Sequence, residues 1–320
     1  MKKYLLNSFI ILFTLVSLSL FGQENPKGYR VEGDEIVFSF DKREYDKATL
    51  DNTNNRLNFD DLNIQDVVVS GNFNDWSRHD WKMTKINENI YELRKNINDF
   101  KDEFAWEFKY VINNSYWAEP SKKDINSTRA KINGLEMRVY NLKMYTAYPS
   151  EFGNATFRLK GYEKAKKVIL AGSFNKWDEN LFKMEKCDGS WEITLQIKPG
   201  IYEYKFIVDG EWMEDKNNPS KIENEFDGYN SVVSIVVPIT FKLQGYQNAE
   251  KVILAGSFNN WSKNKYNMTK TEDGWNIKIM LPGGKHHYKF IIDGEWTLDP
   301  TNTVSEYDEE GNINSVCMVK

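Results

Sequence analysis

Two tryptophans, with a lysine between them in the sequence and an asparagine after them, are the side chains best suited to bind a ligand. The set occurs twice, in the same order and 84 residues apart, as Trp177, Lys205, Trp212 and Asn230 and then as Trp261, Lys289, Trp296 and Asn314. An indole offers a flat apolar face on which the C–H face of a pyranose ring can lie. An ammonium and an amide beside it can hydrogen-bond to sugar hydroxyls. The pattern predicts a shallow aromatic platform for a sugar.

These side chains belong to an internal repeat, and self-similarity of this kind indicates tandem structural units. The stretch Lys167–Trp177 returns almost unchanged as Lys251–Trp261, without a gap. A more divergent copy precedes both and contains Trp76, Lys109 and Trp117, but it has no clear equivalent of the late asparagine. The segment 41–66, rich in Asp, Asn and Lys, lengthens this first copy. We interpret it as an exposed loop or an extra hairpin.

Short strands must position the candidate residues. Runs of β-branched and aromatic residues, such as Val168–Leu170 and Tyr204–Val208, are separated by Asp-Gly and Pro-Gly turn signals, and no convincing helix appears. Because side chains alternate along a strand, Lys205 is expected to point away from the face shared by Tyr204 and Phe206. About seven short strands per repeat predict an immunoglobulin-like sandwich.

The predicted fold class is therefore all-β, with three tandem immunoglobulin-like (early-set) β-sandwich modules. We name them module 1 (28–147), module 2 (153–237) and module 3 (238–320). The junctions, marked by the stretch 148–150 and by Pro238, are short. We expect the modules to form a semi-rigid row.

Each candidate residue also has a structural alternative. A tryptophan in a β-sandwich is often a core residue, and we assign Trp191 and Trp275 to that role because they lie inside regularly alternating strands. Packing is also the preferred role for Trp81, Phe182 and Tyr266. The paired tryptophans lie beside Asn and Gly turn residues, where loops emerge, which favours binding. The lysines could simply be solvated, and the late asparagines could make local turn hydrogen bonds.

The ordered string Gly-Ser-Phe-Asn-x-Trp, Tyr-Lys-Phe, Asp-Gly-x-Trp and a final Asn resembles the family 48 carbohydrate-binding modules. The glycogen-binding domain of the AMP-activated protein kinase β subunit belongs to that group. The resemblance covers nearly all of modules 2 and 3 and part of module 1, and it implies an α-1,4-glucan ligand such as glycogen, starch or a maltooligosaccharide. The binding residues that it implies are Trp177, Lys205, Trp212, Asn230, Trp261, Lys289, Trp296, Asn314, Trp76, Lys109 and Trp117.

Several other classes of function are disfavoured. The net charge is −5 and no Lys/Arg cluster is present, which argues against a nucleic-acid partner. A glycosidase needs two carboxylates at a set separation, and the repeated acids at Asp209 and Asp293 are typical of hairpin turns. The adjacent His286 and His287 would point to opposite faces of a strand, so we expect no metal, no cofactor and no catalytic residue.

The first residues predict a signal peptide at 1–22. Two lysines precede an apolar run from Leu5 to Leu20, and the small Gly22 suits cleavage, with an uncleaved anchor as the alternative. No cysteine follows the run to accept a lipid, and only Cys187 and Cys317 occur, so no disulfide framework is predicted. We expect a secreted or periplasmic protein without membrane insertion after cleavage.

Two hypotheses of function follow. The leading one is a secreted, non-catalytic α-glucan-binding protein that uses tandem platforms for avidity and that works beside a glucan-processing enzyme or importer. The alternative is an adaptor or structural protein of the cell envelope whose sandwiches bind a protein partner, such as a glucan-degrading enzyme to which it is the accessory subunit. Fold alone does not decide between them.

Overall fold

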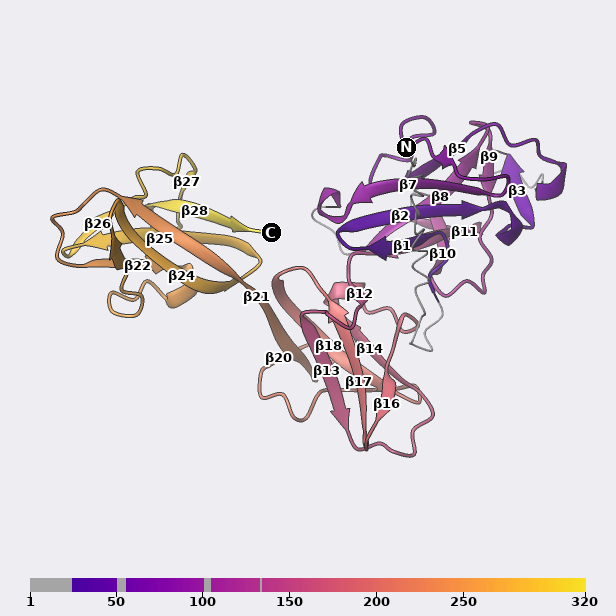
Figure 1. Ribbon diagram of the computed structural model, residues 1–320. Helices are drawn as coiled ribbons and strands as arrows, with labels where there is room; N and C mark the ends of the chain where they lie inside the picture. Colours follow the sequence, from indigo (N-terminus) through magenta and orange to yellow (C-terminus); the bar gives the residue numbers. More distant parts are fainter. Residues whose placement is uncertain (1–24, 51–55, 101–104, 133) are drawn as a thin grey trace, which may run out of the picture.

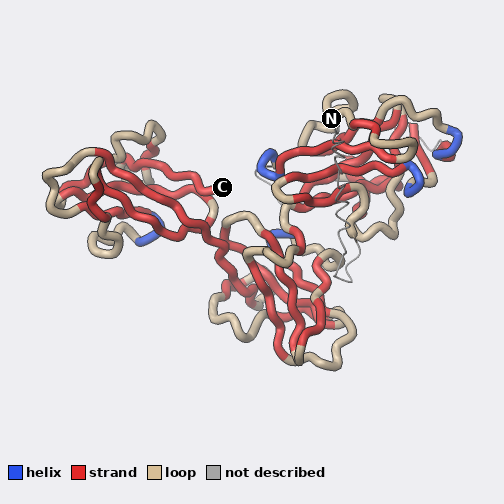
Figure 2. Tube along the Cα trace, in the orientation of Figure 1, coloured by secondary structure: helices blue, strands red, loops and turns tan. Residues whose placement is uncertain are grey.

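The computed structural model describes residues 25–50, 56–100, 105–132 and 134–320, so the predicted signal peptide lies outside the described residues. Strands dominate the described chain, and Figures 1 and 2 show them gathered into three groups along the sequence. The helical segments in these ranges are single 3-10 turns at Lys42–Glu44, Phe59–Asp61, Ile97–Asp99, Ser173–Asn175 and Ser257–Asn259. No helix in the described ranges is long and apolar enough to cross a membrane. The all-β prediction is confirmed.

Module 1 contains two antiparallel sheets. The first has the order β1-β2-β7-β6, with bounds Tyr29–Glu32, Glu35–Asp41, Ile90–Asn96 and Thr84–Lys85. The second has the order β10-β11-β8-β9-β3-β4, with bounds Ser127–Ile132, Leu135–Tyr145, Ala105–Ile112, Tyr116–Ala118, Lys47–Leu50 and Arg56–Asn58; β5 (Val67–Gly71) also pairs with β8. Phe38 of the first sheet and Phe108 of the second meet edge to face, 5.2 Å apart between ring centroids. The core therefore lies between the sheets.

Module 2 repeats this plan with a shorter front end. One sheet has the order β12-β17-β13, with β16 beside β17, and the bounds are Tyr148–Pro149, Ser190–Gln196, Ala155–Lys160 and Glu185–Cys187. The other runs β15-β14-β18-β21, with β19 and β20 at its edges, and the bounds are Phe182–Lys183, Val168–Gly172, Gly200–Val208, Tyr229–Gln244, Glu211–Met213 and Lys221–Glu223. Phe157 of one sheet packs against Tyr204 of the other, with 5.0 Å between their ring centroids.

Module 3 has the same arrangement. The second half of β21 pairs with β24 and β24 with β23, with bounds Gly274–Pro282 and Thr269–Thr271. The opposite sheet has the order β22-β25-β28-β27, with β26 beside β25, and the bounds are Val252–Gly256, Gly284–Ile292, Ile313–Val319, Ser305–Tyr307 and Glu295–Thr297. Phe241 packs against Tyr288 across the sandwich, with 4.8 Å between their ring centroids. This contact is the counterpart of the one between Phe157 and Tyr204 in module 2.

The predicted packing roles of the other aromatic side chains are confirmed. Trp191 and Trp275 are 5% and 6% exposed and lie in the cores of modules 2 and 3. Trp81 and Tyr266 pack against the cores of their modules, and Phe182 is buried. These rings therefore fill the sandwiches and are not presented to a ligand.

The segment 41–66 forms an extra hairpin, one of the two predicted alternatives, although residues 51–55 lie outside the described ranges. Its strands β3 and β4 pair with each other, and β3 also pairs with β9, where Thr49 lies opposite Trp117. The second sheet of module 1 is thereby widened by two strands beyond the point at which the equivalent sheets of modules 2 and 3 end.

Modules 2 and 3 share one strand. β21 pairs with β18 through its first half, up to Ile235, and with β24 from Val236 onwards. Pro238, which we predicted to mark a linker, lies inside this strand and is paired with Met280; a proline is tolerated there because β21 lies at the edge of that sheet. The predicted boundary at 237/238 thus falls within continuous hydrogen-bonded structure.

Gly283 closes the junction between modules 2 and 3. It follows β24, and a Cβ atom built at this position would lie 1.9 Å from the carbonyl oxygen of Pro199. Backbone of module 3 therefore packs directly on backbone of module 2, at a position where only glycine fits.

Replacing Gly283 with alanine should loosen this junction. Because backbone must shift to admit the methyl group, we expect Gly283→Ala to lower the free energy of unfolding by about 1–3 kcal/mol, measured by urea denaturation. Gly228→Ala is the matched control, since its added Cβ would meet Asn224 at an ordinary 3.6 Å. Equal stability of the two variants would contradict the tight junction.

Candidate functional site

The predicted tryptophan pairs come together in space. The ring centroids of Trp177 and Trp212 are 6.1 Å apart with planes inclined at 52°, and those of Trp261 and Trp296 are 6.2 Å apart with planes inclined at 59°. Trp212 and Trp296 are each 40% exposed, and their partners are half-buried. Modules 2 and 3 thus each present two adjoining indoles that form one bent aromatic surface.

An apolar seat on the outer face of the sheet supports each first tryptophan. Trp177 packs on Ile169, Ala171 and Ile207, whereas the alternate residues of β18, including Phe206, face the core. Module 3 repeats the seat at Trp261 with the side chains of Ile253, Ala255 and Ile291. The second tryptophan is held by strand pairing, because Trp212 lies opposite Ile207 and Trp296 opposite Ile291.

The loop that carries Trp177 has an unusual backbone. Lys176 and Trp177 both have positive φ angles, 51° and 59°, which are rare for a bulky residue. The side-chain oxygen of Asn175 accepts the N–H of Gly172 at 2.9 Å, and the N–H of Trp177 donates to the Gly172 carbonyl at 2.9 Å. Gly172 leaves no room for a Cβ atom, which would lie 2.5 Å from the carbonyl oxygen of Glu203. These contacts hold the backbone of the loop in the conformation from which Trp177 projects.

Sequence reasoning missed this role of the asparagine. The side-chain oxygen of Asn259 accepts a hydrogen bond from the N–H of Gly256 at 3.0 Å, and that of Asn74 accepts one from the N–H of Gly71 at 2.9 Å. We call this hydrogen bond from the glycine to the asparagine side chain the asparagine clamp, and all three modules contain it. The signal was present, because an asparagine occupies the position two residues before the first tryptophan in all three copies of the repeat.

The second tryptophan follows a tight hairpin, as its Asp-Gly signal predicted. Asp209 has a φ of 50° and Gly210 a φ of 100°, so both adopt the left-handed conformations that such turns require. The Asp209 carboxylate accepts the backbone N–H groups of Lys166 and Lys167 at 2.9 and 2.8 Å. This carboxylate is therefore committed to holding the turn.

Lys205 and Lys289 lie on the same outer face as the tryptophans, as the alternation predicted. Lys205 is opposite Ala171 and Lys289 opposite Ala255, residues that form part of the two tryptophan seats. Among the described residues, neither ammonium group makes a hydrogen bond or an ion pair. Both donors remain open to a ligand.

Asn230 and Asn314 occupy a different environment. They are 8% and 2% exposed. The amide nitrogen of Asn230 donates to Glu203 at 2.6 Å, and its oxygen accepts from Asn224 at 2.9 Å. The amide nitrogen of Asn314 donates to the Asp308 carboxylate at 3.0 Å. In this structure both amides hold neighbouring turns, which was the alternative role considered for them.

Module 1 brings Trp76 and Trp117 together but closes the site. Their centroids are 6.2 Å apart, yet Trp117 is only 9% exposed and Arg78 lies 5.0 Å from the centre of its ring. Lys109, predicted as a sugar ligand, is 5% exposed and ion-paired with Glu119 at 2.8 Å.

The extra hairpin contributes to this closure. The hydroxyl of Thr49, on β3, donates to the Glu119 carboxylate at 2.6 Å. Burial lowers the pKa of Lys109, and the Glu119 carboxylate acts against that shift. The ammonium of Lys109 therefore lies inside the module, out of reach of a surface ligand.

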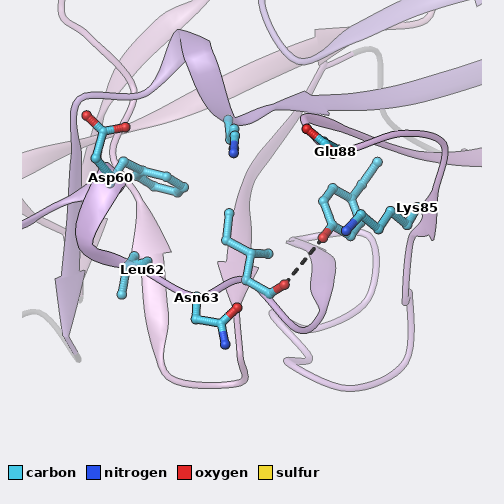
Figure 3. Close-up of a pocket in the computed structure, with 9 residues that line it drawn as sticks. Asp60, Leu62, Asn63, Lys85 and Glu88 are labelled. Carbon is cyan, nitrogen blue, oxygen red and sulfur yellow. Dashed lines mark hydrogen bonds between the residues drawn. The ribbon is translucent and has the colours of Figure 1, made fainter.

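A polar pocket of about 210 Å³ also lies in module 1, away from the tryptophans (Figure 3). The hairpin segment and the turn before β7 line it, with Asp60 and Glu88 as acids and Lys42 and Lys85 as bases. It contains none of the predicted binding residues.

The described residues include no group of three or more His, Cys, Asp or Glu side chains that could hold a metal ion. His286 bonds to the carbonyl of Pro282 at 2.9 Å and His287 to Glu306 at 3.1 Å. The two imidazoles thus have separate partners.

Comparison with known sequences gives consistent matches. A family model described as the glycogen recognition site of AMP-activated protein kinase matches residues 155–242 and 237–320. The β-1 subunit of 5'-AMP-activated protein kinase from Sus scrofa is 39% identical over 83 residues, which cover 26% of this chain and 64% of that subunit sequence. The β-1 subunit from Rattus norvegicus is 37% identical over 83 residues, which cover 26% of this chain and 29% of that subunit. The chain thus spans less than two thirds of the length of these relatives.

Solved structures match more loosely. A maltogenic amylase from S. marinus aligns with a TM-score of 0.22 and 16% identity, over 54% of this chain and 30% of the amylase. A pullulanase from Bacillus acidopullulyticus aligns with a TM-score of 0.20 and 11% identity, over 92% of this chain and 37% of the pullulanase.

The family matches fall on modules 2 and 3, in which the paired indoles are accessible and the strand lysine has no partner among the described residues. They extend together from residue 155 to residue 320, which is more than half of the chain. The protein belongs to the family defined by the glycogen recognition site of AMP-activated protein kinase.

Proposed function

We propose that this chain is a secreted, non-catalytic α-glucan-binding protein in which modules 2 and 3 each carry one glucan platform. The observation that carries the proposal is the repeated geometry of two adjoining indoles beside an open lysine donor. The indoles take the apolar faces of successive glucose units, and their mutual inclination suits a curved chain. The lysine donates to hydroxyl groups at the edge of the sugar rings.

The non-catalytic assignment rests on the character of the platform. The two indoles, the apolar seat and the strand lysine that form it are apolar or cationic, the Glu203 carboxylate accepts from the Asn230 amide, and the nearby Asp209 carboxylate is engaged by two backbone N–H groups. Glycoside hydrolysis needs two carboxyl groups that flank the scissile bond. The platform supplies contacts for holding a glucan and no such pair for cleaving it.

Avidity is the expected advantage of two platforms in one chain. Each site is a shallow outer face of a sheet, so its affinity for a short glucan is modest. Engagement of two linked sites by one polymer strengthens binding by roughly 10²- to 10⁴-fold over a single site when the geometry allows it. The preferred ligand is therefore a polymer such as glycogen or starch. The predicted signal peptide supports export from the cytoplasm, and we propose that the exported protein works beside a glucan-processing enzyme or importer.

Affinity electrophoresis in gels that contain glycogen or soluble starch tests the assignment. We expect retardation of the unaltered protein, partial retardation of Trp177→Ala and of Trp261→Ala, and a loss of at least ~100-fold in apparent affinity for the double variant. Phe152→Ala is the matched control, because Phe152 is 93% exposed and lies outside both platforms. Free migration of the unaltered protein would refute glucan binding and favour a protein partner, whereas equal retardation of the double variant would refute binding through the two tryptophan platforms.

The lysines provide a second test, because the same position is open in module 3 and buried in module 1. Lys289→Met should weaken retardation and leave stability within about 0.5 kcal/mol of the unaltered protein. Lys109→Met leaves the half-buried Glu119 carboxylate without its cation, so it should destabilise module 1 by about 3 kcal/mol and leave retardation unchanged. Urea denaturation gives the stabilities, and a loss of retardation in folded Lys109→Met would contradict the closed site.

A further inference from the structure

Module 1 is attached to module 2 directly beside the Trp177 loop. Asp178, the residue after Trp177, is 9% exposed. Its carboxylate accepts the hydroxyl of Tyr145 at 2.5 Å and is ion-paired with Lys143. Both partners belong to β11, the last long strand of module 1. A second oxygen of the carboxylate accepts the N–H of Asn180 at 3.0 Å within the loop itself.

This attachment is a packed interface. Tyr145 is fully buried and joins the hydrophobic core of module 2, together with Ala105 and Ala147. The hydroxyl of Tyr148 donates to the carbonyl of Gly33 in the turn between β1 and β2, at 3.2 Å. In Figure 1, β12 of module 2 lies close to the strands of module 1. Because the Asp178 carboxylate is buried, loss of either partner leaves a charge without its compensation.

The loop of module 2 relies on Asp178 in a way that the other loops do not. The amide nitrogen of Asn175 donates forward to the carbonyl of Asp178 at 3.2 Å. In module 3 the equivalent Asn259 donates backward to Leu254, and in module 1 Asn74 donates backward to Val69. In module 2, the clamp residue Asn175 is thus bonded to Asp178, and Asp178 is bonded to Tyr145 and Lys143 of module 1.

The electrostatics agree with this anchoring. Burial raises the pKa of Asp178, but the hydrogen bonds from Lys143 and Tyr145 outweigh burial and hold the pKa below its ordinary value. The carboxylate is therefore charged at neutral pH, as the pairing with Lys143 requires. Module 3 has Ser262 at the corresponding position, so its loop has no such charge.

We propose that Asp178 is a positioning residue that couples glucan binding at the Trp177/Trp212 platform to the docking of module 1. This inference rests on the proposed function of that platform. Docking holds Asp178, Asp178 holds the Asn175 clamp, and the clamp fixes the left-handed backbone from which Trp177 projects. The platform of module 3 is independent of module 1.

Binding of maltoheptaose to a Trp261→Ala protein isolates module 2. Asp178→Asn retains an oxygen for the Asn180 N–H and removes the charge, so we expect the dissociation constant to rise about three- to tenfold. Lys143→Met, altered from the module 1 side, should act in the same direction. The double variant should be no weaker than the weaker single variant, because both changes break one interaction. In a Trp177→Ala protein, the same changes should leave binding by module 3 unaltered.

Coupling must also act in reverse, because linkage between two sites is reciprocal. Maltoheptaose should slow amide hydrogen exchange in β11 of the Trp261→Ala protein, and Asp178→Asn should abolish that slowing. A residue that only supports folding would produce no ligand-dependent change in β11.

Two results would overturn the coupling. One is a folded Asp178→Asn variant with unaltered affinity together with exchange in β11 that is indifferent to maltoheptaose; this outcome leaves the glucan platform standing. The other is a Trp261→Ala protein that fails to bind maltoheptaose and glycogen although Asp178 is intact, which removes the proposed function of module 2 as well.

Discussion

The alternation of side chains along β18 and β25 is the constraint on which the two platforms depend. One set of side chains, including Phe206 and Phe290, fills the sandwich, so the intervening residues must face outwards. Those residues form the apolar seat of the first tryptophan and present the lysine beside it. The burial that stabilises each module and the surface that binds are thus two faces of one strand. A hydrophobic seat makes an exposed indole rigid, and a rigid indole loses little entropy when a sugar lies on it.

Much of this arrangement could be predicted from sequence because it is local or periodic. The orientation of Lys205 follows from a period of two, the Trp212 hairpin from an Asp-Gly pair, and the pairing of the tryptophans from their recurrence at one spacing. The core positions of Trp191 and Trp275 follow from the same alternation. Each of these inferences uses residues that are neighbours along one strand or across one turn.

What could not be predicted depends on contacts between distant segments. Lys109 lies between two aromatic residues like the other strand lysines, but it is buried and ion-paired with Glu119, which also accepts from Thr49 of the inserted strand β3. The partners of Asp178 lie in another module, so no local pattern indicates them. Asn230 shows a further limit, because an amide suited to a sugar hydroxyl is equally suited to a turn, and composition cannot distinguish the two. The three modules share a topology, yet the inserted hairpin occurs only in module 1, whose tryptophan site is closed, and not in modules 2 and 3, whose sites are open.

The strand shared by modules 2 and 3 also restricts how this protein can change over evolution. Ile235 faces the core of module 2, and Phe241 and Leu243, further along the same strand, face the core of module 3. All three lie on one face of β21, because they are separated by even numbers of residues. If a single residue were inserted or deleted between them, the core-facing side chains of one half of β21 would point towards solvent. The spacing between the two cores is therefore inherited in steps of two residues, unlike the freely variable length of a flexible linker.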